Sequence, residues 1–255
     1  MRKPIQNPII VALDMLGKEE VIETIKELEE GKMVWGYKLS TPIFAEGVRL
    51  LEEIEKSVGS VNLLIDLQLI GTPKFIEDSI KLFCRTAVRF IVCNAAAGPT
   101  AIRRAVATAH HPTKILVGSS LSSLSLADIR FIFGAVNREA KADDFTAMTR
   151  ETKAAGLYCA AEELEHLSRQ PEKRDIPMTV AVAIRPDSYP DKGEHIFTLT
   201  PNQAKERGAR FIVIGGPITE LQGWDDPKPR TKTEAAERIL AGIDEKYLTF
   251  RVEGE

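Results

Sequence analysis

Short apolar runs alternate with amphipathic stretches along the whole chain, and this repeat limits the folds that it can adopt. Eight runs have the length of a strand, and their continuous apolar character is typical of strands buried on both faces. Between the first of these runs, two sets of apolar residues have the spacing of one helix face each. They are Val21, Ile25 and Leu28, and Phe44, Val48 and Leu51. Eight units of strand then helix predict a (β/α)8 TIM barrel, a single α/β domain that spans residues 1–255.

The expected strands are spread through the chain, with a helical stretch after each one. They comprise residues 9–12, 34–39, 61–65, 88–93, 114–118, 157–159, 178–183 and 210–214. The sixth unit is the weakest, because its strand is very short. Residues 137–144 are polar enough to predict a loop or a frayed helix end.

The composition is that of an ordinary soluble protein. A length of 255 residues is near that of one such barrel, and a formal net charge of -3 provides no basic surface for a nucleic-acid partner. No apolar run approaches the roughly 20 residues that span a bilayer, and the first residues lack the apolar core of a signal peptide. We therefore expect a cytoplasmic protein with no membrane or nucleic-acid partner. The cysteines are odd in number and form no C-x-x-C pair, so neither a disulfide framework nor a metal site is expected.

Polar residues follow the expected strands at the end where a barrel of this class carries its active site. Lys38 and Asp66 end the second and third strands, so their side chains can converge across the mouth of the barrel. Asp66 alone could be a helix cap or part of a salt bridge, but its pairing with Lys38 favours a functional role. We predict that these two residues are catalytic. Other residues at the strand ends are Asp14, Asn94, Arg185, Gly215, Gly216 and the serine-rich segment 119–123.

Two turns near the end of the sequence predict a site for a phosphate. Thr200 and Pro201 open a helix with a capping residue and a proline, and Gly215 and Gly216 follow the eighth strand with little side-chain bulk. Backbone N–H groups there can face an anion, and barrels often hold a phosphate after strands seven and eight. The alternative is a tight turn that needs glycine. The long connection of residues 184–199 could be a lid or a surface loop.

Six segments resemble orotidine 5'-phosphate decarboxylases and occur in the order seen in that family. They are PIIVALDM at 8–15, YKLSTPIFAEG at 37–47, LLIDLQLIGTP at 63–73, CNAAAGP at 93–99, SSLSSL at 119–124 and LTPNQAKERGARFIVIGGPIT at 199–219. The resemblance covers nearly the whole chain. It implies a barrel that forms a homodimer with active sites at the interface, and a reaction that converts orotidine monophosphate into uridine monophosphate without metal or cofactor. The implied ligand is a small phosphorylated molecule, a pyrimidine nucleotide in that family.

The resemblance also assigns roles to individual residues. Asp14 matches an aspartate that contacts the ribose, and Ser123 matches a serine near the pyrimidine. Lys38 and Asp66 match the first lysine and the first aspartate of the family's Lys, Asp, Lys, Asp tetrad, and that aspartate crowds the substrate carboxylate. Together with the phosphate turns and the lid, the expected substrate-binding residues are Asp14, Ser123, His195, Thr200, Gly215 and Gly216.

Other positions depart from the family pattern. Where the family reads D-x-K-x-x-D, this chain has Asp66, Gln68 and Gly71, so the second lysine and the aspartate lent by the other subunit are both replaced. An amide cannot act as an acid in place of an ammonium, and general acid catalysis contributes on the order of 10²- to 10⁴-fold. Gly216 stands where the family has a phosphate-binding arginine, and His195 where its lid has a glutamine. We therefore expect activity on orotidine monophosphate to be very low or altered.

Three functions are open to such a chain. The first is slow decarboxylation, with Lys74 as a substitute acid. The second is a lyase or isomerase reaction on a phosphorylated sugar, metal-assisted through Asp66, because segments around Ser40 and Gly215 also resemble hexulose-6-phosphate synthases. Lys38 argues against this branch, which has an acidic residue there, and the expected lid favours the decarboxylases. The third is a barrel that binds a phosphate or a nucleotide without turnover.

Overall fold

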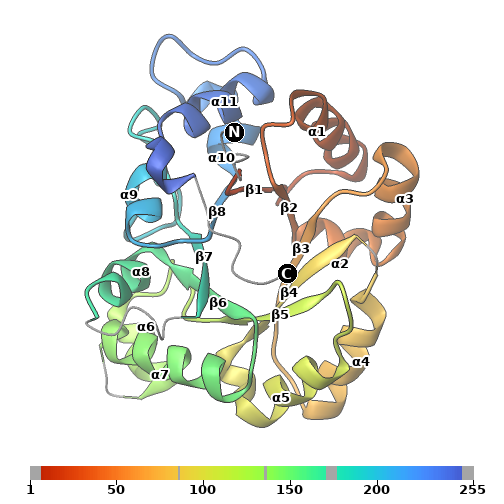
Figure 1. The fold of residues 1–255 in the computed structure, drawn as a ribbon, viewed down its shortest axis with the longest axis vertical. Coiled ribbons are helices and arrows are strands. Elements are labelled where there is room, and N and C mark those ends of the chain that lie inside the picture. Colours follow the sequence, from red (N-terminus) through yellow and green to blue (C-terminus); the bar gives the residue numbers. More distant parts are fainter. Residues whose placement is uncertain (1–6, 86, 135–136, 171–176, 249–255) are drawn as a thin grey trace.

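Eight parallel strands close into a barrel in the computed structural model, which describes residues 7–85, 87–134, 137–170 and 177–248 (Figure 1). The strands are β1 Ile9–Ala12, β2 Gly36–Leu39, β3 Leu63–Leu69, β4 Val88–Asn94, β5 Lys114–Gly118, β6 Gly156–Ala160, β7 Met178–Val182 and β8 Phe211–Ile214. They pair in chain order, and β1 closes the ring against β8. The predicted TIM barrel is therefore confirmed.

Helices follow each strand and surround the barrel (Figure 1). Local sequence starts several of them: Thr72 and Thr200 each precede a proline, and each hydroxyl accepts a hydrogen bond from the N–H three residues on. The helices are α1 Lys18–Gly31, α2 Thr41–Glu46, α3 Arg49–Val58, α4 Pro73–Phe83, α5 Gly98–Thr108, α6 Leu126–Phe133, α7 Arg138–Glu151, α8 Ala161–Ser168, α9 Pro201–Glu206, α10 Gly216–Thr219 and α11 Lys232–Ala241. Within the described ranges, no helix is long and apolar enough to cross a membrane.

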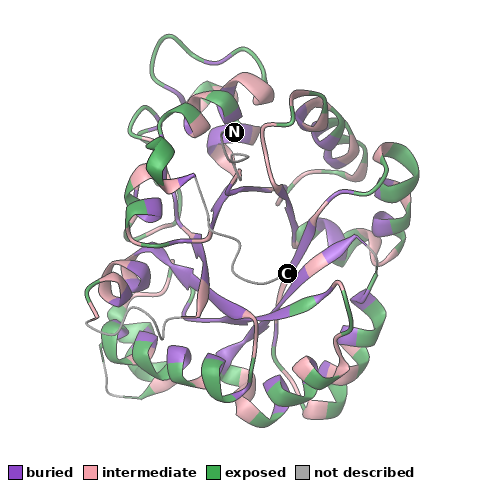
Figure 2. Cartoon of the chain, viewed as in Figure 1, coloured by how far each residue is buried: buried purple, intermediate pink, exposed green. Residues whose placement is uncertain are grey.

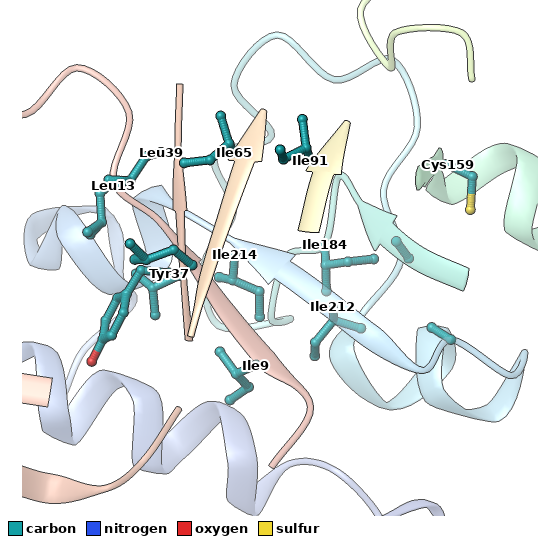
Figure 3. Packing of buried hydrophobic residues seen from close by; sticks show 14 of the residues in the cluster. Ile9, Leu13, Tyr37, Leu39, Ile65, Ile91, Cys159, Ile184, Ile212 and Ile214 are labelled. Atoms are coloured by element: carbon teal, nitrogen blue, oxygen red, sulfur yellow. The ribbon is translucent and has the colours of Figure 1, made fainter. Parts of the chain in front are cut away.

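Apolar side chains form two layers, one on each side of the barrel wall. The outer layer packs between strands and helices and includes Leu39, Ile65 and Ile212 (Figure 3). The inner layer fills the barrel, where the rings of Trp35 and Phe90 stack with 5.6 Å between their centroids. The strands are accordingly buried along most of their length, whereas the outward faces of the helices are exposed (Figure 2). Because successive residues of a strand alternate between the layers, every second residue points into the barrel.

The segment after β2 forms two short helices, so the prediction of one helix face with Phe44, Val48 and Leu51 is wrong. The chain breaks between α2 and α3 at Gly47, whose φ of 64° is a conformation that glycine adopts without steric cost. Leu51 is buried on α3, but Phe44 is 74% exposed on α2. The break turns the apolar side chain of Phe44 toward the mouth of the barrel, where it lines a cavity.

Residues 137–144 form the N-cap and the first turns of a regular helix, so the prediction of a loop or a frayed helix end there is wrong. Asn137 caps α7, and its Oδ1 accepts a hydrogen bond from Ala140 N at 2.8 Å. The polar sequence misled the prediction, because this helix buries polar as well as apolar side chains, among them Arg138 and Thr146. The short sixth strand was correctly placed, and β6 is five residues long.

The third strand extends beyond the predicted residues 61–65 and ends at Leu69. Its pairing with β4 is irregular between Ile65 and Leu69, and Gln68 has a φ of 44° in the left-handed region. Such a bulge redirects side chains locally. As a result Asp66 lies inside the strand instead of at its end, and both Asp66 and Gln68 line the mouth of the barrel.

Candidate active site

A cavity of about 600 Å³ opens at the carboxyl ends of the strands. This is where a barrel of this class places its ligand, because the loops that follow the strands converge there. The cavity brings together residues that are far apart in the sequence. The predicted residues that line it are Asp14, Lys38, Asp66, Gln68, Ser123, His195, Gly215 and Gly216.

Lys38 lies between two carboxylates in this cavity. Its Nζ is 2.5 Å from Asp14 Oδ2 and 3.5 Å from Asp66 Oδ2, and its side chain is only 8% exposed. Asp14 is held in turn by Ser40, whose hydroxyl donates to Asp14 Oδ1 at 2.5 Å. Burial lowers the pKa of Lys38, but the two carboxylates outweigh burial, so the pKa is raised above its ordinary value. The side chain is therefore a cation at neutral pH.

Asp66 accepts hydrogen bonds from two further side chains. The Tyr158 hydroxyl donates to Asp66 Oδ2 at 2.7 Å, and Gln68 Nε2 donates to Asp66 Oδ1 at 2.8 Å. Burial and the charge of Asp66 raise the pKa of Tyr158 well above its usual value, so the phenol stays protonated. Tyr158 was not predicted from the sequence. The available signal was its place in the middle of the 157–159 strand, where the alternating pattern turns it into the barrel.

Gln68 is held by hydrogen bonds at both ends of its amide. Nε2 donates to Asp66, and Oε1 accepts from Asn94 Nδ2 at 2.8 Å. Asn94 is itself fixed, because its Oδ1 accepts from Ala96 N at 2.9 Å. Gly118 provides the space for this arrangement, since a Cβ at that position would lie 2.6 Å from Gln68 Oε1. Gln68 therefore orients Asp66 from a fixed position.

Three residues singled out from the sequence lie outside the cavity. Lys74 is exposed on α4 and pairs with Asp78 at 2.6 Å, so the structure contradicts its role as a substitute acid within its own chain. Thr200 caps α9 as predicted, its hydroxyl accepting from Gln203 N at 3.1 Å, while its binding of substrate through backbone N–H groups stays a prediction. Gly71 lies past the end of β3 and does not line the cavity.

Arg185 also lines the cavity. The sequence placed this cationic residue at the end of a strand but did not predict a role for it. Its Nε donates to Asp191 O at 3.2 Å and its Nη1 to Ile184 O at 3.1 Å. In the part of the chain that the structure describes, its guanidinium forms no ion pair with a carboxylate, and burial lowers its pKa. Gly216 also lines this region, and a side chain there would crowd the Tyr189 hydroxyl, 3.1 Å from the Cβ position. Arg185 is thus available to an anionic ligand.

The connection after β7, for which a lid or a surface loop was predicted, contributes Arg185 and His195 to the lining of the cavity. Backbone hydrogen bonds close its base, with Arg185 N donating to Leu199 O at 2.9 Å. Near its far end, His195 Nδ1 is 2.8 Å from Ser122 Oγ, which belongs to the loop after β5. Burial, with the nearby charges of Arg185 and Lys38, lowers the pKa of His195 to about 4, so the imidazole is neutral at pH 7.

A family model matches most of the chain. The model described as "Orotidine 5'-phosphate decarboxylase / HUMPS family" matches residues 7–228. The chain belongs to this family. It is 27% identical over 241 residues to the orotidine 5'-phosphate decarboxylase of Nautilia profundicola, covering 93% of this chain and 99% of that one. Its identity to the Campylobacter concisus enzyme is 26% over 240 residues, covering 92% and 99%.

Solved structures of the same fold are similar over nearly the whole chain. The orotidine 5'-phosphate decarboxylase of Lactobacillus acidophilus superposes with a TM-score of 0.73 at 22% identity, covering 96% of this chain and 100% of that one. An uncharacterized conserved protein from Geobacillus kaustophilus gives 0.69 at 18% identity, covering 92% and 99%. At these identities the likeness establishes the fold of this decarboxylase-family chain.

A buried carboxylate supports the loop after β5 in this decarboxylase-family barrel. Glu163 on α8 is fully buried and accepts hydrogen bonds from the Ser119 and Ser120 hydroxyls and from Ala160 N. Arg138 on α7 donates to Ser120 Oγ at 2.9 Å from the other side. Burial raises the pKa of Glu163, although these hydrogen bonds and Arg138 partly oppose the shift. Since both serines line the cavity, the cluster fixes one of its walls.

The two carboxylates of the cavity, Asp14 and Asp66, lie on either side of the Lys38 ammonium. Among the described residues, no group of three or more His, Cys, Asp or Glu side chains could hold a metal. Asp66, the expected ligand in a metal-assisted reaction, accepts from Tyr158 and Gln68 and faces Lys38. Mg²⁺ is usually held by one or two carboxylates together with several waters, and in this cavity the Lys38 ammonium already lies between the two carboxylates. The donor set therefore fits Mg²⁺ poorly.

Proposed function

We propose that this chain binds a pyrimidine nucleoside 5'-monophosphate in the cavity and decarboxylates orotidine 5'-monophosphate slowly. The observation that carries the proposal is the position of Lys38, whose ammonium lies between Asp14 and Asp66 in the mouth of the barrel. Membership of the decarboxylase family supports this class of substrate. The volume of about 600 Å³ lies in the range of sites for small ligands, which also supports it.

Two groups of polar residues support one orientation of the nucleotide. Arg185 offers a guanidinium that pairs with no carboxylate of the described residues, and Gly215 and Gly216 expose backbone without side chains, which suits a phosphate. Lys38 and Asp66 form the second group, which suits the reacting pyrimidine. In this orientation Arg185 takes the place of the phosphate-binding arginine expected at position 216.

Decarboxylation breaks the bond between the pyrimidine and its carboxylate and leaves an electron pair on the ring carbon. Asp66 would face the substrate carboxylate and raise its energy, and Lys38 would stabilise the negative charge that forms. Their hydrogen bonds hold both groups in place before the reaction, so little reorganisation is needed. Gln68 carries no acidic proton at this point, and we therefore propose that the rate is low.

The experiment that tests this function compares the wild-type chain with the double variant Gln68→Lys, Gly71→Asp. We expect the wild type to bind uridine monophosphate in calorimetry, and the double variant to decarboxylate orotidine monophosphate about 10²-fold faster, because an ammonium returns to the reacting end. An aspartate at position 71 requires a shift of Phe75, whose ring is exposed and can move. Turnover is measured as the loss of orotate absorbance.

The control for this comparison is Gln68→Met, which removes the amide without adding an acid. It is expected to show no gain in turnover. Failure of the wild type to bind uridine monophosphate would reject the proposed function. Tight binding without turnover by either chain would reject decarboxylation and favour a nucleotide-binding barrel.

We further propose that the chain forms a homodimer through its mouth patch, defined as Met15, Phe44, Ile70 and Phe75. These side chains are 85%, 74%, 56% and 53% exposed, and they follow the neighbouring strands β1, β2 and β3. Exposed apolar patches of this kind mark protein interfaces.

We expect sedimentation to give twice the chain mass for the wild type and the single chain mass for the double variant Phe44→Glu, Phe75→Glu. The matched control Phe131→Glu, on exposed α6, should stay dimeric, and a monomeric wild type would contradict the proposal.

A further inference from the structure

Tyr158 brings a hydroxyl across the barrel to the carboxylate of Asp66. It comes from β6, whereas Asp66 comes from β3, and the hydroxyl lies 2.7 Å from Asp66 Oδ2. The ring is buried in the inner apolar layer with Leu116 and Val180, and only 6% of the residue is exposed. Tyr158 nevertheless lines the cavity. The apolar anchor therefore fixes the hydroxyl beside the group that would face a substrate carboxylate.

The other polar groups near Asp66 are poorly suited to give up a proton. The amide of Gln68 has no acidic proton and is bound at both ends. The ammonium of Lys38 is held between Asp14 and Asp66, and its loss of a proton would leave two buried carboxylates without a cation between them. Among the described residues the Tyr158 hydroxyl makes one hydrogen bond, to Asp66, so rotation about its C–O bond frees the proton for a ligand.

We propose that Tyr158 is the catalytic proton donor of this site, an inference that rests on the proposed function. When the bond between the ring and its carboxylate breaks, carbon dioxide leaves and the electron pair stays on the ring carbon. The Tyr158 O–H bond then breaks, and its proton forms a C–H bond with that carbon. The phenolate regains a proton from solvent that enters the cavity once the product has left, because Tyr158 lines that cavity. No oxidant or metal takes part in the step.

The test is Tyr158→Phe, with Tyr37→Phe as the matched control. Tyr37 is likewise a buried tyrosine whose hydroxyl donates to a carboxylate, Glu29 Oε1 at 2.7 Å, but it does not line the cavity. We expect Tyr158→Phe to lower kcat on orotidine monophosphate by on the order of 10²-fold or more and to leave the Kd for uridine monophosphate within about threefold. Tyr37→Phe should leave both values unchanged.

A second comparison separates proton donation from the mere positioning of Asp66. In the background Gln68→Lys, Gly71→Asp, an ammonium at position 68 provides another proton, so Tyr158→Phe should then cost less than about threefold in kcat. A loss as large as in the wild-type background would mean that Tyr158 acts only by holding Asp66, and it would overturn the proposal.

The remaining outcomes also decide between this inference and the proposed function. If Tyr158→Phe turns over orotidine monophosphate as fast as the wild type, Tyr158 is not the proton donor, and the proposed function stands. Binding of uridine monophosphate without wild-type turnover would overturn the donor and the decarboxylation, while nucleotide binding would stand. Absence of both binding and turnover would overturn both proposals.

Discussion

Lys38→Met is expected to lower decarboxylation of orotidine monophosphate by at least about 10³-fold, because it removes the only cation between Asp14 and Asp66 in the described part of the cavity. Methionine fills a similar volume, so the effect comes from the lost charge. Without the ammonium the two carboxylates repel each other, and no positive charge remains between them to hold Asp66 in place or to stabilise the charge that forms on the substrate. The measurement is kcat from the orotate absorbance, together with the Kd for uridine monophosphate.

The control for this variant is Lys18→Met. Lys18 also pairs with a carboxylate, Glu53 at 3.3 Å, but the pair lies on the surface and outside the cavity. Exposed ion pairs contribute little to stability, and this pair does not reach the cavity. Turnover of Lys18→Met should therefore stay within about twofold of the wild-type value. Unchanged turnover in Lys38→Met would show that the ion pair has no part in the chemistry, and the proposed function would lose its main support.

Glu163→Leu is expected to lower the free energy of unfolding by about 3–5 kcal/mol, the range for removing one partner from a buried charged cluster. The Ser119 and Ser120 hydroxyls and Ala160 N would lose their acceptor in a fully buried place. Arg138 would keep its guanidinium buried with one carboxylate fewer nearby. The measurement is chemical denaturation at neutral pH. A loss below about 1 kcal/mol would show that the cluster does not stabilise the fold.

Glu163→Gln is the matched variant for the same cluster, and it has a pH signature. The glutamine keeps the shape of the side chain and one acceptor oxygen, so the free energy of unfolding is expected to fall by about 1 kcal/mol. Burial raises the pKa of the Glu163 carboxyl above its ordinary value of 4.5. The stability that this shift provides is fully present below pH 4.5, and it is lost as the pH rises through the pKa of the folded state. The amide does not titrate. The stability difference between wild type and Glu163→Gln should therefore shrink as the pH rises, and a difference that grows would contradict the assigned shift.

Part of the site was predictable because strand order and side-chain alternation are local properties of the sequence. Lys38 and Asp66 follow apolar runs, and parallel strands carry the residues at their carboxyl ends to the same mouth. The same pattern places Gly215 and Gly216 there. The helix cap predicted at Thr200 is also a local property, and it is confirmed, because the Thr200 hydroxyl accepts from Gln203 N at the start of α9.

The sequence by itself determined that this chain is a closed barrel with an ammonium and a carboxylate at its mouth. Only the tertiary structure decided what surrounds them. Tyr158 and Asp66 are separated by 92 residues, and only closure of the barrel brings the hydroxyl to the carboxylate. Arg185 is likewise identified by its lack of an ion pair among the described residues, which no spacing reveals. The physical reason is that a strand pattern fixes the direction of a side chain, whereas its partners depend on packing across the whole ring.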